Sequence, residues 1–129
     1  MTQEEKQLII RDLCTKLPYG VKVEVCIKDK NIKSVDCVKY DTVGTYIRLM
    51  DDEKFSIKPY LRPLSSMTEE ERKEYELLAN HCIVTSIGFI HLEAASLIDW
   101  LDMNKFDYRG LIPKGLALEA PEGMYEISK

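Results

Sequence analysis

The stretch VKVEVCIKDKNIKSVDCVKY (residues 21–40) decides the fold class of this chain. Over residues 21–27 every second side chain is a Val or an Ile, and Lys, Glu and Cys lie between them. This period of two is that of a β-strand with one buried face. Residues 29–31 (DKN) form a turn, and residues 32–40 then predict a second strand. The chain therefore begins a sheet with a hairpin.

Two further strands are predicted after this hairpin, over residues 45–50 and 55–57. The first is rich in β-branched and aromatic side chains, and the polar turn 51–54 separates the two. Short turns favour antiparallel pairing of strands that follow one another in the chain. We expect a four-stranded antiparallel meander, and its closure into a small SH3-like barrel is an open alternative.

Helical patterns flank the predicted meander. Thr2 and Glu5 have the spacing of a capping box and begin a helix over residues 3–16, which the sequence LPYG (17–20) ends. Thr68 and Glu71 have the same spacing and begin a second helix.

The second helix is expected over residues 69–80 and a third over residues 93–104. Pro59 and Pro63 mark residues 58–64 as an extended connector, since proline cannot donate to a sheet ladder. Residues 83–89 fit either a strand or a buried loop, and the chain ends in an irregular tail. These elements predict one α+β domain over residues 1–129: an N-terminal helix, the meander, two helices and the tail.

Composition and charge exclude several classes of protein. The 129 residues are 45% hydrophobic and 31% charged, which is typical of a globular domain. A net charge of −4 disfavours a duplex nucleic acid as partner, because duplex binding needs a basic excess. The first residues do not resemble a signal peptide, and the apolar stretch 83–92 is too short to span a membrane. We therefore expect a cytoplasmic protein without a membrane partner.

The four cysteines give no sign of a metal or redox site. Cys14, Cys26, Cys37 and Cys82 contain no CxxC pair, so four separate buried thiols without disulfides are expected. His81 and Cys82 are adjacent, a spacing that rarely lets two side chains bind one ion. We expect no metal and no cofactor.

No catalytic motif is present either. The chain lacks phosphate-binding glycine loops, HExxH and GxSxG, so we expect no catalytic residues. Asp99 and Asp102 lie three residues apart on a predicted helix and are the best candidate carboxylate pair. A small hydrolase or a metal enzyme is the less favoured alternative to a non-enzymatic binding protein.

Two segments combine basic and aromatic side chains, each bounded by proline or glycine. Arginine binds phosphate through two parallel hydrogen bonds, and tyrosine stacks on a nucleobase. If the two segments converge, they form a site for an anionic small molecule such as a nucleotide. The alternative is that the arginines are structural anchors, paired with glutamates of the second helix. The candidate ligand-binding residues are Lys58, Tyr60, Arg62, Tyr108, Arg109 and Lys114.

Contact with another protein is a third hypothesis. Trp100, Met103 and Phe106 lie at the end of the third predicted helix, and such side chains are common anchors at interfaces. Their alternative role is a core stripe. Formation of a homo-oligomer, through this face or through an exposed strand edge, is left open.

The C-terminal half resembles a group of phage proteins. The stretches KPYLRPLSSMTEEE (58–71) and IDWLDMNKFDYRGLIPKGLALEAPEGMY (98–125) are similar to small uncharacterised proteins of gut Bacteroidales phages and prophages. The resemblance implies a phage-associated origin and the cytoplasm of a bacterial host, and it brings no activity. The expected function is that of a small phage-associated protein that binds or sequesters an anionic molecule, such as a nucleotide signal of host defence. The alternative is an inhibitor or adaptor that acts on a host or phage protein.

Overall fold

The first helix forms as the sequence predicts. The structure is a computed structural model that describes residues 2–84 and 90–125; of residues 81–84 and 90–95 it describes the backbone only. Helix α1 (Gln3–Lys16) begins with the capping box, in which Glu5 N donates to Thr2 Oγ1 and Thr2 N donates to Glu5 Oε1. A short 3-10 helix, η1 (Leu17–Tyr19), follows it.

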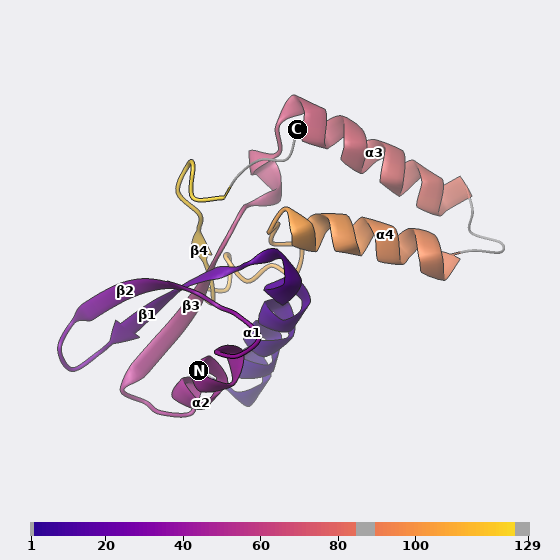
Figure 1. Ribbon diagram of the computed structural model, residues 1–129. Coiled ribbons are helices and arrows are strands. Elements are labelled where there is room, and N and C mark those ends of the chain that lie inside the picture. Colours follow the sequence, from indigo (N-terminus) through magenta and orange to yellow (C-terminus); the bar gives the residue numbers. More distant parts are fainter. Residues whose placement is uncertain (1, 85–89, 126–129) are drawn as a thin grey trace.

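Four strands form one mixed sheet. They are β1 (Lys22–Ile27), β2 (Ile32–Cys37), β3 (Phe55–Leu61) and β4 (Leu118–Glu119). Their order across the sheet is β2-β1-β3-β4 (Figure 1). β1 pairs antiparallel with β2 and with β3, whereas β3 and β4 are parallel. The α+β class is confirmed, but the sequential antiparallel meander is wrong.

The strand predicted over residues 45–50 is a helix. Helix α2 (Val43–Met50) follows a turn in which Lys39 N donates to Thr42 Oγ1. Val43, Tyr46, Leu49 and Met50 pack against the core at helical spacing. Burial along this period outweighs the strand propensity of β-branched and aromatic residues.

Because residues 43–50 form a helix, the next strand in the chain is β3, and it pairs with β1 on the side opposite to β2. β2 and β4 are therefore the two edge strands of an open sheet, and the described residues do not close into the SH3-like barrel. Part of the predicted irregular tail is β4, whose Ala120 N donates to Leu61 O just beyond the strand.

The predicted connector around Pro59 is also a strand. Lys28 N donates to Lys54 O at 2.9 Å, so these two residues are a hydrogen-bonded pair. In an antiparallel ladder such pairs alternate with pairs that are not hydrogen-bonded. Pro59 lies opposite Val23, at one of the intervening positions. Its nitrogen therefore faces away from β1, on the side where β4 begins only opposite the next residue, Tyr60. Proline fits this strand because no donor is needed at that point.

The two later helices form an antiparallel hairpin that projects from the sheet (Figure 1). They are α3 (Glu69–Val84), preceded by the short 3-10 helix η2 (Leu64–Ser66), and α4 (Ile90–Met103). Both predicted helices are confirmed, with bounds that differ by a few residues. Of the ambiguous segment 83–89, residues 85–89 lie outside the described residues.

Helices α1 and α2 cover one face of the sheet. Alternate residues of β1 and β3 are buried beneath them, together with side chains from the C-terminal segment. A second apolar cluster lies at the base of the α3–α4 hairpin, around Trp100, Leu101 and Phe106. No helix of the described residues lies on the other face of the sheet (Figure 1).

Candidate functional site

Arg62 is anchored where β3 leads into α3. Its Nη1 and Nη2 donate to Glu71 Oε2 and Oε1 at 2.8 and 2.6 Å, a two-point ion pair. Nη2 also reaches the carbonyl of Ser66, and the guanidinium lies over the Phe106 ring. Burial would raise the pKa of the Glu71 carboxyl, but the hydrogen bonds from Arg62 and Thr68 outweigh it and lower that pKa. The charge of Arg62 is thus compensated within the fold.

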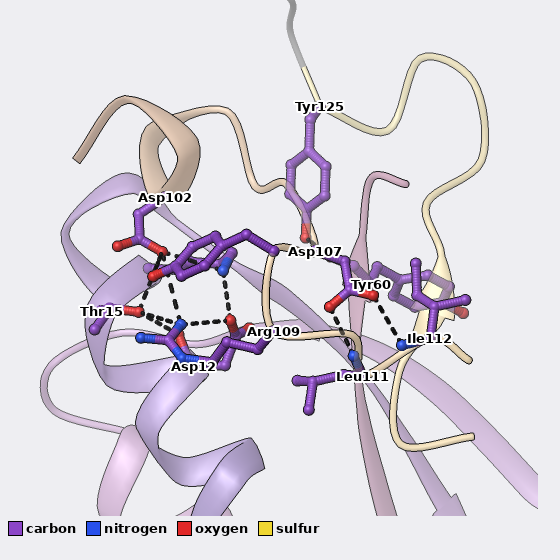
Figure 2. Close-up of polar contacts among 11 residues, drawn as sticks. Asp12, Thr15, Tyr60, Asp102, Asp107, Arg109, Leu111, Ile112 and Tyr125 are labelled. Carbon is purple, nitrogen blue, oxygen red and sulfur yellow. Dashed lines mark hydrogen bonds and ion pairs between the residues drawn. The ribbon is translucent and has the colours of Figure 1, made fainter. Parts of the chain in front are cut away.

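Arg109 belongs to a buried ionic network between α1, α4 and the loop after α4. Its Nη1 lies 2.9 Å from Asp12 Oδ1 and 3.2 Å from Thr15 Oγ1. Lys16 Nζ donates to the same Asp12 oxygen and to Asp102 Oδ1. Figure 2 shows Asp12, Thr15, Asp102 and Arg109 facing one another. The network balances two carboxylates with two cations and ties three segments together.

The centre of the network is buried. Lys16 and Asp12 are fully buried, and Oδ2 of Asp12 accepts no hydrogen bond from any described residue. Burial raises the pKa of Asp12 despite the nearby Lys16 and Arg109. Tyr108 donates its hydroxyl to Asp102, and burial followed by that bond raises the pKa of Tyr108 to about 12. These side chains do not line the cavities beside Arg62, along the start of α1 or around residues 50–56.

Another carboxylate, that of Asp107, accepts backbone hydrogen bonds in the loop that leads to Lys114. Asp107 Oδ1 accepts from Leu111 N at 2.8 Å, and its Oδ2 accepts from Ile112 N at 2.9 Å (Figure 2). Lys114 is exposed in the turn that follows, near enough to Glu5 to help lower the pKa of that carboxyl, although the hydrogen bonds of the Glu5 capping box contribute more. Lys114 therefore lies toward the start of α1.

Lys58 and Tyr60 lie on the face of the sheet that carries no helix. Lys58 is opposite Glu24 of β1, and Tyr60 donates its hydroxyl to Glu24 Oε2 at 3.2 Å. The backbone carbonyl of Tyr60 accepts from the hydroxyl of Tyr125, whose oxygen in turn accepts from Lys22 N. This phenol pins the C-terminal segment to the sheet.

The six candidate residues therefore do not line one cleft. The structure brings together Lys58 with Tyr60, and Tyr108 with Arg109. Within the described residues, no hydrogen bond or ion pair joins Arg62 to either residue of the second pair. The anchor hypothesis predicted a glutamate partner for both arginines. It is confirmed for Arg62, whereas Arg109 is paired with aspartates.

Sequence reasoning missed the ionic network. Two signals in the sequence could have revealed a buried pair. Asp12 and Lys16 have the i, i+4 spacing of a helical ion pair, and they have apolar neighbours in α1. The partnership with Asp102 is not visible in the sequence. Asp99 is exposed and Asp102 is buried, so the candidate carboxylate pair does not share one environment.

One cavity of about 350 Å³ lies between the start of α3 and the C-terminal segment. Of the six candidate residues, Arg62 alone lines it, and Thr68 lines it too. This size is within the range of small-molecule sites. The residues that line the cavity are Arg62, Pro63, Ser66, Thr68, Ala120, Pro121, Glu122, Gly123 and Tyr125.

β2 is the most exposed strand of the sheet, judged by the exposure of its residues. All but one of its residues are exposed, including Ile32 at 51% and Val35 at 53%. Val38 N donates to Val21 O, so Val21 and Val38 are a hydrogen-bonded pair of the β1–β2 ladder. Hydrogen-bonded and non-hydrogen-bonded pairs alternate from there along the antiparallel strands. In that alternation, the backbone N–H and C=O groups of Lys33, Val35 and Cys37 point outward. Within residues 2–84 and 90–125, β2 has no strand partner on this side.

The cysteines differ in exposure from the sequence-based expectation. Cys14 and Cys37 are exposed and Cys26 is half-buried, so the prediction of buried thiols is wrong for the first two. Both lie on elements with an exposed face, which a scattered cysteine pattern does not reveal. The side chains of Cys82, His81 and His91 lie outside the described part. Among the side chains that the structure describes, no group of His, Cys, Asp and Glu could hold a metal ion.

The aromatic residues at the end of α4 mostly belong to the core. Trp100 and Phe106 are buried and stack at 5.7 Å between ring centroids, and Trp100 Nε1 donates to Glu74. Met103 is 42% exposed. Of the three side chains proposed as interface anchors, only Met103 is therefore exposed enough to contact a partner. None of the described helices is long and apolar enough to cross a membrane.

Comparison with known proteins assigns no family. No family model, no curated protein and no solved structure matches the chain.

Proposed function

We propose that this protein is a non-enzymatic binding protein whose ligand is an extended polypeptide segment, added as a new strand to the outer edge of β2. The observation that carries the proposal is the exposure of this edge. Six residues long, β2 is exposed along nearly its whole length. Proteins usually shorten, cover or charge such an edge because it pairs readily with other strands.

The state of the two arginines supports a polypeptide ligand over a nucleotide. Arg62 already binds both oxygens of Glu71, and Arg109 contacts Asp12 and Asp102. A phosphate would have to displace these carboxylates and leave them unpaired in a buried place, which is costly. Main-chain pairing at an edge needs no such displacement.

A small molecule in the cavity beside Arg62 is the second candidate function. The cavity volume of about 350 Å³ favours this candidate, because it is large enough for a small molecule. Because Glu71 neutralises Arg62, an uncharged polar ligand fits this cavity better than an anion. Titration calorimetry with linear and cyclic nucleotides tests the anionic form of this candidate, which fails if none binds.

The setting that we propose is the cytoplasm of a phage-infected bacterium. The resemblance of residues 58–71 and 98–125 to phage proteins supports this part of the proposal. A small protein with a free sheet edge suits the role of an inhibitor or adaptor that acts on a host or phage protein.

The test of the proposed function uses short random peptides displayed on phage and selected on the immobilised protein. Val35→Pro removes an outward N–H of β2 without removing a bond to β1, and Val35→Thr is the matched control that keeps that N–H. Selected peptides should bind the wild type and the Thr variant and lose binding to the Pro variant. Amide exchange should slow at residues 33–37 in the complex. Binding that survives Val35→Pro would refute the proposal.

A further inference from the structure

The two faces of β2 differ in charge. Lys33, Val35 and Cys37 share the face that carries no helix, because they lie opposite residues of β1 on that face. Ser34 and Asp36 alternate with them and belong to the other face. There, burial raises the pKa of Tyr46 of α2, and the nearby Asp36 adds to that shift. A strand added beside β2 would therefore place alternate side chains next to Lys33 and Val35.

Positive charge dominates the open face of the sheet. Over β1, β2 and β3 this face carries Lys22, Lys33 and Lys58 but a single carboxylate, Glu24. That carboxylate already accepts a hydrogen bond from Tyr60. The excess is local, since the whole chain has a net charge of −4.

This charge disfavours a second copy of the chain as the occupant. Two β2 strands paired antiparallel are related by a two-fold axis perpendicular to the sheet, so both open faces would lie on the same side. The combined face would double the lysine excess of each copy, and like charges close together on a sheet are destabilising. An acidic segment would instead bring negative charges close to these lysines, which is stabilising.

From the proposed function, on which this step rests, we infer that the segment bound at β2 alternates acidic and apolar side chains along one of its faces, at every second position. An acidic side chain lies next to Lys33, and an apolar one, two residues along, packs on Val35. Cross-strand pairs of opposite charge and of apolar side chains are the interactions that stabilise neighbouring strands. The acidic residues also meet the field of Lys22 and Lys58, which are farther from the edge.

The experiment measures the affinity of three synthetic peptides of equal length by fluorescence anisotropy. In each peptide Thr occupies every second position, and the positions between, which share one face of a strand, alternate Val with a test residue. The test residue is Glu in the first peptide, Ser in the second and Lys in the third. The Glu peptide should bind tightest and the Lys peptide weakest, and high salt should reduce the difference. Lys33→Glu should weaken binding of the Glu peptide by about tenfold. Lys30→Glu, at the hairpin tip, makes the same charge change away from the edge and should leave the affinity nearly unchanged.

The outcomes separate this inference from the proposed function. If all three peptides bind alike and lose binding in Val35→Pro, the edge binds strands without charge preference and the inference is wrong. If no peptide depends on Val35, the proposed function fails as well. If light scattering shows a dimer that Val35→Pro dissociates, the occupant is a second copy and the acidic segment is refuted.

Discussion

Arg62 at the end of β3 and Glu71 in the first turn of α3 form a buried two-point ion pair, with nitrogen–oxygen distances of 2.8 and 2.6 Å. Glu71 also accepts from Thr68 N through its capping box, and Arg62 packs on Phe106. One carboxylate thus joins the last residues of the sheet to the start of the helical hairpin. The pair fixes the position of α3 relative to β3.

Loss of Arg62 should destabilise the fold. Arg62→Ala leaves Glu71 buried without its cation, which is expected to cost about 3–5 kcal/mol. Arg62→Lys should recover part of that loss, because an ammonium keeps the charge but cannot make two parallel bonds. Urea unfolding followed by circular dichroism gives both values. If the Ala variant were as stable as the wild type, the pair would not be an anchor.

Glu71 should make stability depend on acid pH. Its pKa in the folded protein is below the ordinary value of 4.5, so the unfolded chain binds more protons below that pH. Its contribution is fully present above about pH 4.5 and is lost as the pH falls through the lower folded value. Unfolding free energies measured across this range should fall less steeply in Glu71→Gln than in the wild type. Equal slopes would contradict the prediction.

The buried network should be intolerant of single changes and more tolerant of a double one. Lys16→Met leaves Asp12 and Asp102 with Arg109 alone and should cost about 3–5 kcal/mol. Asp12→Leu combined with Lys16→Met removes a whole pair and should cost clearly less, since Asp102 keeps Arg109 at 4.0 Å and the Tyr108 hydroxyl. Urea unfolding of the wild type and both variants measures this. A double variant less stable than the single one would contradict it.

The second capping box should contribute stability without any ligand. Glu71 N donates to Thr68 Oγ1 at 3.1 Å, so Thr68→Ala should cost about 1 kcal/mol. Ser65→Ala, on the exposed short helix just before it, is the control and should change stability by less than about 0.5 kcal/mol. Thermal unfolding distinguishes the two. A loss of peptide or nucleotide binding at unchanged stability would instead assign Thr68 to the neighbouring cavity.

The thiols should react in order of exposure. Cys14 and Cys37 should be labelled first by a maleimide in the native protein, and Cys26 more slowly, since it is half-buried. Under denaturing, non-reducing conditions all four cysteines should be free, because none of the three whose side chains the structure describes forms a disulfide. Mass spectrometry of the labelled protein counts them. Fewer than four labels after denaturation would indicate a disulfide.

Local patterns determined much of the secondary structure. The capping boxes at Thr2 and Thr68 and the alternation in β1 predicted α1, α3 and the β1–β2 hairpin, because each depends on residues a few positions apart. Propensity failed for α2, where the apolar period and the core decided against a strand. It failed for Pro59, which the ladder tolerates because its nitrogen faces away from β1.

The candidate site depended on partners distant in sequence. That Arg62 and Arg109 are basic was plain from the sequence, but their carboxylate partners, Glu71 for one and Asp12 and Asp102 for the other, are chosen by the packing of whole elements. The same packing placed β1 in the middle of the sheet and left β2 at its edge. Sequence alone determined α1, α3, α4 and the β1–β2 hairpin, since these depend on neighbouring residues. Only the tertiary structure decided which charges are already paired and which strand edge is free, because both depend on contacts between segments far apart in the chain.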